Sequence, residues 1–167
     1  MQVLKNTDFV IIPMLNPDGV VAGNFRTSLF GKDLNRLWKS KDTTLIPEIE
    51  MCRNVFTELV ETYKKNMLLF MDYHGHSTRK NAFLLGPGIF DAQLMNDIRI
   101  LPKIMANYSP IFRYPSCSFR LDENRKTTAR ALFGKFAGLS YTVETSNWSY
   151  YSYPTKEVFD MEMKHFE

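Results

Sequence analysis

Two histidines and one glutamate are the residues of this sequence best suited to metal-assisted catalysis. His74 and His76 flank a glycine directly after an apolar run, and Glu144 ends another apolar run, 139–143. Neutral imidazole is a common zinc ligand, and we expect at most one of the two histidines to meet a given metal ion. By itself a His-x-His pair is a weak signal, because hydrogen-bonded loop histidines match it by chance more often.

Glu144 is a candidate general base. A carboxylate at the end of a run built for burial needs a partner or has a raised pKa, and a raised pKa suits a base that works near neutral pH. A buried salt bridge to an arginine would meet the same need without any chemistry. From the residues alone, both interpretations stay open.

Two arginines in a turn-rich segment could bind an anion. Arg26 ends the segment 23–26, and Arg36 lies within the segment 31–38. A planar guanidinium holds a carboxylate through two parallel hydrogen bonds. Taken alone, these arginines could equally be surface charges.

Short apolar runs predict the strands that position these residues. The run 9–15 has the composition of a buried strand, although Pro13 would put its end near a sheet edge. A turn is expected at 16–19, where proline and glycine favour a reversal of the chain. Further strands are expected at 67–71, 81–85 and 139–143.

Apolar positions at helical spacing predict the helices. The stripe from Cys52 to Tyr63 predicts an amphipathic helix that Thr44 and Pro47 help to start. Further helices are expected at 91–108 with a kink at Pro102, at 127–136, and after Thr155 with Phe159, Met163 and Phe166 facing inward.

The alternation of strands and helices predicts an α/β fold, a mixed β-sheet flanked by helices, in one domain spanning 1–167. In such sheets ligands gather at the carboxyl ends of the strands. Three expected strands end at Asn16, His74 and Glu144. We therefore expect these residues at one rim of the sheet.

The composition is that of a packed globular protein. It is 44% hydrophobic, 23% charged and 14% aromatic, which argues against disorder. A net charge of +3 is too small to favour a nucleic-acid partner, and no apolar stretch has the length of a membrane span. With Cys52 and Cys117 read as free thiols, we expect a cytoplasmic protein with no nucleic-acid or membrane partner. The sequence does not determine its oligomeric state.

Several motifs follow one another in a specific order along the chain. They are Ile12-Pro-Met-Leu-Asn-Pro-Asp-Gly19, Gly23-Asn-Phe-Arg26, Asp33-Leu-Asn-Arg36 with Trp38, Asp72-Tyr-His-Gly-His-Ser77, Thr128-Ala-Arg130 and Tyr141-Thr-Val-Glu-Thr145. This series resembles the cytosolic carboxypeptidases, a branch of the zinc carboxypeptidase family that removes C-terminal glutamates from proteins such as tubulin. The resemblance spans 9–145, most of the chain.

The resemblance implies catalytic roles for three residues. His74 corresponds to the C-terminal zinc ligand, and Glu144 to the glutamate that activates the zinc-bound water. Arg26 is similar to the residue that stabilises the oxyanion formed when water attacks the scissile carbonyl.

The resemblance also implies how substrate is bound. Asn35 and Arg36 resemble the pair that grips the terminal carboxylate of the substrate. Arg130 stands where the family lines its specificity pocket, and a cation there would favour an acidic terminal residue.

The family's other two zinc ligands come from a His-x-x-Glu motif before the Asn-Pro-Asp-Gly turn, and residues 1–15 contain neither histidine nor glutamate. Asp33 resembles the aspartate that orients the missing histidine. We therefore expect a truncated, partial catalytic domain. By itself it should be marginally stable and inactive, and should bind the one zinc ion poorly.

Three hypotheses about function follow from the resemblance. The first is a zinc-dependent metallocarboxypeptidase that removes glutamate from acidic C-terminal tails of proteins such as tubulin, in the cytoplasm and at microtubules or cilia. The second is a metal-free pseudoenzyme that binds acidic tails through Arg26, Arg36 and Arg130 without hydrolysing them. The third, a zinc deacylase acting on small N-acyl amino acids, fits the motifs less well.

Overall fold

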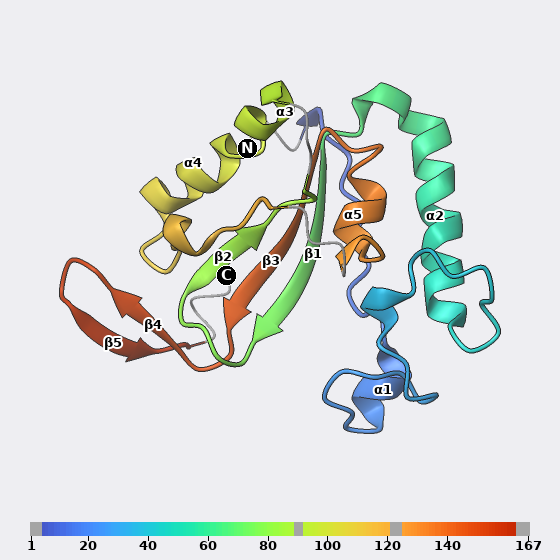
Figure 1. Cartoon of the computed structure of the whole chain (residues 1–167), viewed down its shortest axis with the longest axis horizontal. Helices are drawn as coiled ribbons and strands as arrows, with labels where there is room; N and C mark the ends of the chain where they lie inside the picture. Colours follow the sequence, from blue (N-terminus) through green and yellow to red (C-terminus); the bar gives the residue numbers. More distant parts are fainter. Residues whose placement is uncertain (1–4, 89–91, 121–124, 163–167) are drawn as a thin grey trace.

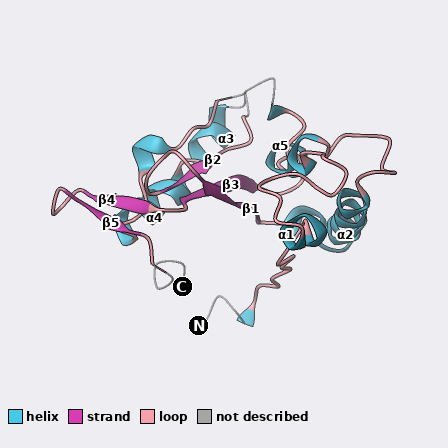
Figure 2. Ribbon diagram, turned by 90° about the horizontal axis from the view of Figure 1, so that it is seen from below, coloured by secondary structure: helices cyan, strands magenta, loops and turns pink. Residues whose placement is uncertain are grey.

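Strand β3 forms the centre of a three-stranded mixed sheet. The computed structural model describes residues 5–88, 92–120 and 125–162, and its sheet has the strand order β1-β3-β2. β1 (Leu69–His76) runs parallel to β3 (Leu139–Ser146), whereas β2 (Ala82–Leu85) runs antiparallel to it. Helices lie on both sides of this sheet (Figures 1 and 2), so the predicted α/β fold is confirmed.

The strands expected at 67–71, 81–85 and 139–143 are all present, and two extend further than predicted. β1 continues through His74 and His76, and β3 continues through Glu144. These polar residues therefore lie within the strands and not in the turns that follow them.

Helix α2 (Pro47–Tyr63) covers one face of the sheet together with η2 (Leu34–Arg36) and α5 (Ala129–Phe133). Pro47 stands in the first turn of α2, where a missing N–H costs no hydrogen bond, and two glutamates in that turn favour the helix dipole. Thr44 makes no capping hydrogen bond to α2, because the position that precedes the helix is Ile46. α5 is shorter than the helix expected at 127–136.

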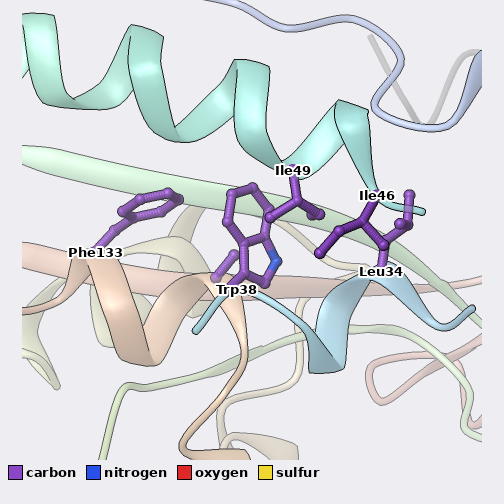
Figure 3. Packing of buried hydrophobic residues seen from close by; sticks show 6 residues of the cluster. Leu34, Trp38, Ile46, Ile49 and Phe133 are labelled. Atoms are coloured by element: carbon purple, nitrogen blue, oxygen red, sulfur yellow. The ribbon is translucent and has the colours of Figure 1, made fainter. Parts of the chain in front are cut away.

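An apolar cluster holds α2, η2 and α5 together (Figure 3). The rings of Trp38 and Phe133 meet edge to face with centroids 5.0 Å apart, and Ile49 of α2 is fully buried beside them. Aromatic pairs of this geometry add stability beyond the area they bury. The buried members of the cluster are Leu34, Trp38, Ile46, Ile49, Ala129 and Phe133.

Helices α3 (Ala92–Asp97) and α4 (Ile100–Tyr108) pack on the other face of the sheet, against a second apolar cluster. The kink expected at Pro102 is wrong in position, because the helix breaks earlier and Pro102 lies in the first turn of α4. Proline has no N–H to donate to the carbonyl four residues before it, which is that of Ile98. The hydroxyl of buried Tyr141 donates to this carbonyl instead, at 2.9 Å.

The expectation of a buried strand at 9–15 is wrong. This segment makes no backbone pairing with the other described residues, and its apolar side chains up to Met14 are exposed, Ile11 by 77%. The turn expected at 16–19 begins a short helix, α1 (Pro17–Val21), whose Gly19 N–H donates to the side chain of Asn16. A strand forms only where an adjacent strand pairs with its backbone N–H and C=O groups. The composition of the run 9–15 does not show whether such a partner strand is present.

The expectation of a last helix capped by Thr155 is also wrong. β4 (Ser149–Ser152) and β5 (Glu157–Asp160) form an antiparallel hairpin instead, in which Phe159 stacks on Tyr150 with ring centroids 5.4 Å apart. Cross-strand aromatic pairs favour a hairpin over a helix. Two of the expected inward residues, Met163 and Phe166, lie outside the described residues. The remaining short elements are η3 (Lys64–Asn66) and η4 (Tyr114–Ser116).

Cys52 and Cys117 are both free and partly buried. No helix in the described part of the chain is long and apolar enough to cross a membrane.

Candidate active site

All the site residues predicted from the sequence line one cleft of about 760 Å³. Strands β1, β2 and β3 all contribute to its lining, and so do residues within 25–36 and the start of α5. The predicted residues on this cleft are Arg26, Asn35, Arg36, His74, Arg130 and Glu144.

The alternation of side chains along parallel strands brings His74 and Glu144 together. The two residues are direct partners in the register of β1 and β3, and Asp72 is likewise opposite Thr142. Positions two apart on a strand share a face, so all four side chains lie on the same side of the sheet. The imidazole and the carboxylate therefore meet at the carboxyl end of two neighbouring strands, where ligands of such sheets gather.

Asp72 is the main partner of His74. Its Oδ2 lies 2.8 Å from Nε2 of His74, and Nδ2 of Asn35 lies 3.1 Å from both atoms. Because an ionised carboxylate only accepts, His74 Nε2 and Asn35 Nδ2 both donate to Asp72. In the neutral ring, the lone pair that remains for another ligand is then on Nδ1.

Burial and charge act in opposite directions on His74. Burial by itself lowers the pKa of His74, but the hydrogen bond that His74 donates to Asp72 and the charges of Asp72 and Glu144 outweigh it. The pKa is therefore raised above its usual value of 6.5, despite a small opposing effect of Arg26. The neighbouring carboxylates thus stabilise positive charge at this point of the cleft.

His76 lies on the same face as His74 but closes the turn after β1. Its Nδ1 accepts from the backbone N–H of Thr78 at 3.2 Å and of Arg79 at 3.0 Å. Its ring centroid is 5.4 Å from that of Phe83. These contacts give His76 a local structural role in the cleft wall.

Glu144 is half-buried and lines the cleft. The alternative of a structural salt bridge from Glu144 to an arginine is not realised among the described residues. The carboxylate thus lies beside His74 in a cleft that solvent reaches.

Asp33 holds Arg26 in place at the side of the cleft. Its Oδ2 lies 2.7 Å from Nε of Arg26, and its Oδ1 accepts from the backbone N–H of Asn35 at 3.0 Å. The side chain of Arg26 remains 44% exposed and lines the cleft. Asp33 therefore holds the guanidinium through Nε without burying it. The resemblance implied that Asp33 orients a histidine; among the described residues, Asp33 instead orients Arg26.

Asn35 joins η2 to the sheet and to α5. Its Nδ2 donates to Asp72, and its Oδ1 accepts from the backbone N–H of Ala129 at 2.9 Å. Both ends of its amide are thus engaged within the protein. Arg36 is exposed, and within the described residues only its Nη1 donates to the protein, to the backbone carbonyl of Asn35 at 2.9 Å. Of the two, Arg36 is the residue with donors directed to a ligand.

Arg130 is a buried cation with neutral partners. The residue is only 7% exposed. Its Nε donates to the carbonyl of Gly86 at 2.9 Å, and its Nη1 donates to Oγ1 of Thr142 at 3.0 Å. Burial, with a contribution from the charge of Arg125, lowers the pKa of Arg130, and the charges of Asp72 and Glu144 oppose this shift. A buried charge without a charged partner is costly, so this position favours an anionic ligand.

A comparison with known protein families identifies the family of this chain. Residues 1–165 match the family model described as zinc carboxypeptidase. The chain belongs to the zinc carboxypeptidase family.

Within the zinc carboxypeptidases, the chain is similar to the cytosolic enzymes. It is 40% identical to cytosolic carboxypeptidase 1 of Gallus gallus over 153 residues, and 40% identical to cytosolic carboxypeptidase 4 of Mus musculus over 157 residues. These matches cover 83% and 85% of this chain but 12% and 14% of the relatives. The chain therefore spans a small part of the length of the curated relatives that it matches.

Solved metallo-carboxypeptidase structures share the fold. A metallo-carboxypeptidase from Burkholderia cenocepacia superposes with a TM-score of 0.68 at 28% identity, covering 81% of this chain and 35% of that one. A metallo-carboxypeptidase from Pseudomonas aeruginosa, with (2-guanidinoethylmercapto)succinic acid bound to it, gives a TM-score of 0.63 at 24% identity, covering 81% of this chain and 36% of that one. The second likeness supports the fold alone.

The described residues of this zinc carboxypeptidase chain do not complete a zinc site. Within 5–88, 92–120 and 125–162, no three His, Cys, Asp or Glu side chains are grouped to hold a metal ion. A catalytic zinc takes three protein ligands and keeps one open position. His74 fits as one such ligand, but its neighbours Asp72 and Glu144 do not add two more.

Sequence reasoning missed several residues of the cleft. Asp72 was not singled out as the partner of His74, although an aspartate two positions before a histidine in a strand shares its face. Arg79, Arg120 and Arg125 also line the cleft, from segments that carry no spacing signal toward it. Only the fold places these cations beside the predicted site.

Proposed function

We propose that the protein to which this chain belongs is a zinc-dependent metallocarboxypeptidase that removes glutamate from acidic C-terminal tails of proteins such as tubulin. The observation that supports an acidic terminal residue best is Arg130, a buried guanidinium whose hydrogen-bond partners, Gly86 and Thr142, are neutral. A terminal glutamate side chain would supply the missing negative charge through a bidentate pair.

The remaining residues divide the chemistry of peptide hydrolysis among them. Glu144 takes the proton of the attacking water and passes it to the leaving amine. Arg26, fixed by Asp33, stabilises the negative charge that develops on the scissile carbonyl oxygen. Arg36 binds the terminal carboxylate of the substrate, and this contact restricts cleavage to the chain end. Asn35 supports Arg36, because its side chain bonds to Asp72 of the sheet and its backbone carbonyl accepts from Arg36.

His74 supplies one ligand to a single zinc ion, and two further ligands come from outside the described residues. Family membership supports the metal. When bound, zinc supplies a Lewis acid that lowers the pKa of a water molecule and polarises a carbonyl.

A second candidate function is binding of acidic tails without hydrolysis. One observation favours it, namely that the guanidinium groups of Arg26, Arg36 and Arg130 line the same cleft. Arg26, Arg36 and Arg130 would bind an acidic tail without a metal ion, since their contacts to the protein leave guanidinium donors facing the cleft.

We further propose a cytoplasmic location, with microtubules or cilia as the sites of action. The relatives in chicken and mouse are named cytosolic carboxypeptidases, which supports the first part. Tubulin is proposed as a partner because its acidic tails match the charge of the cleft.

The test uses the full-length protein with its metal and a fluorescent peptide that ends in glutamate. We expect release of free glutamate, which a chelator stops and added zinc restores. Glu144→Gln should lower kcat at least about a hundredfold, as loss of a general base does, while peptide binding persists. Lys41→Gln, a change of an exposed lysine outside the cleft, is the matched control. Peptide binding without any glutamate release by the metal-loaded protein would support the second candidate and refute the first.

A further inference from the structure

A second basic cleft opens from the candidate active site. It has a volume of about 700 Å³ and shares Arg79, Ser118 and Arg120 with the first cleft. Lys80 and Arg113 line the second cleft only. The two clefts are therefore parts of one continuous depression.

The second cleft lies at the opposite end of this depression from Arg36. Residues 112–118 run along β2 through the bridges of Phe112 with Ala82 and of Ser118 with Leu85. η2, by contrast, contacts β1 through the side chain of Asn35. Since the strand order is β1-β3-β2, a path from η2 to the second cleft crosses the strand ends that carry the candidate catalytic residues.

The cations of the second cleft have no carboxylate partner among the described residues. The guanidinium of Arg79 lies over the ring of Phe83 at 5.3 Å, and that of Arg113 lies over the ring of Tyr153 at 5.3 Å. Nε of Arg113 is buried and has no hydrogen-bond partner in the described part of the chain. No aspartate or glutamate is among the described residues that line the cleft, so its charge is uncompensated there.

The backbone fixes Arg113 before any ligand binds. Its N–H donates to the carbonyl of Ala82 at 2.8 Å, and its carbonyl accepts from the N–H of Ser116 at 3.1 Å. The ring of Tyr153, 5.3 Å from the guanidinium, restrains the side chain as well, so less conformational entropy is lost when an anion binds.

We propose that this second cleft, lined by Lys80 and Arg113, binds acidic side chains of the substrate tail that precede the terminal residue. The proposal rests on the proposed function, because it assigns the terminal carboxylate to Arg36 and directs the preceding chain past His74 and Glu144. The protein would then select runs of acidic residues and not a terminal glutamate alone.

Two variants of the full-length, metal-loaded protein test the second cleft. The double variant Lys80→Gln/Arg113→Gln removes the two cations that line the second cleft but not the first. The control Lys39→Gln/Lys41→Gln removes two exposed cations outside both clefts. The first probe is a labelled hexaglutamate peptide with an amidated C-terminus, which has no terminal carboxylate for Arg36 to bind. By fluorescence anisotropy we expect the cleft variant to bind it roughly 3-fold to 10-fold more weakly, as loss of two partly exposed ion pairs predicts, and the control to bind it like the parent protein.

The second measurement compares kcat/KM for two cleavable peptides, both ending in glutamate, with glutamates or glutamines upstream. The cleft variant should lose the advantage of upstream glutamates and cleave the glutamine peptide as the parent does. Equal losses on both peptides, no binding of the amidated peptide by the parent protein, or equally tight binding of a single-stranded oligonucleotide would each overturn the proposal. Arg113→Lys, which keeps the charge, should restore much of the preference; if it behaves like Arg113→Gln, the effect is structural and the proposal is wrong. If the amidated peptide binds through Lys80 and Arg113 but no peptide is cleaved, the proposed function fails while the second cleft stands.

Discussion

Replacement of Arg130 tests whether the buried guanidinium selects the terminal residue. Arg130→Met keeps the length and the apolar stem of the side chain but removes its charge. Hydrogen bonds to charged groups contribute about 1.5–3 kcal/mol, and each 1.36 kcal/mol corresponds to tenfold. We therefore expect the ratio of kcat/KM for glutamate-ending over glutamine-ending peptides to fall about 10-fold to 150-fold.

The control must separate this charge from the structural contacts of Arg130. Thr142→Val has nearly the same shape and removes the acceptor for Nη1, but it leaves the guanidinium bonded to Gly86. The valine variant should lose some thermal stability and keep the preference for glutamate, whereas the methionine variant should lose the preference. If Arg130→Met discriminates glutamate from glutamine as well as the parent does, the assignment of Arg130 to the specificity pocket is wrong.

Three further predictions concern the folded chain. Tyr141→Phe should lower the free energy of unfolding by about 1–3 kcal/mol in urea denaturation. The Ile98 carbonyl would lose its hydrogen-bond donor, because Pro102 has no N–H to replace the Tyr141 hydroxyl. An unchanged denaturation midpoint would contradict this. Burial, partly offset by the Leu84 N–H, raises the pKa of the Cys117 thiol above its usual value of 9.0, so mass spectrometry should find it alkylated by iodoacetamide more slowly than a free cysteine. The unfolded thiol then ionises first, so this group's contribution to stability is present below pH 9.0 and is lost as the pH rises from 9.0 through the raised pKa of the folded state. The 167-residue chain by itself should self-associate in sedimentation experiments, since apolar residues such as Ile11 are exposed by as much as 77%, and a sharp thermal transition of a monomer would refute that expectation.

The elements that sequence reasoning predicted correctly are those with a strong local pattern. α2 follows from apolar residues at helical spacing behind Pro47, and β1 and β3 follow from uncharged runs rich in branched and aromatic residues. The motifs in one order predicted the family, which the match over residues 1–165 confirms.

The elements that it missed depend on partners far along the chain. The run 9–15 has the composition of a strand, yet it forms none, because its hydrogen bonds find no partner strand among the described residues. The helix expected after Thr155 is a hairpin, because Phe159 pairs with Tyr150 on the neighbouring strand. A local pattern states which residues are apolar and at what spacing, but not what will lie beside them.

The sequence by itself determined the family and the residue types of the site, because each motif is a local arrangement. Only the tertiary structure decided that His74 is opposite Glu144, that Asp72 accepts a hydrogen bond from His74, and that Arg130 is buried between neutral groups. It also placed Arg113 beside a second cleft. These relations depend on strand register and on which surfaces pack together, and both are set by contacts between residues distant in the sequence.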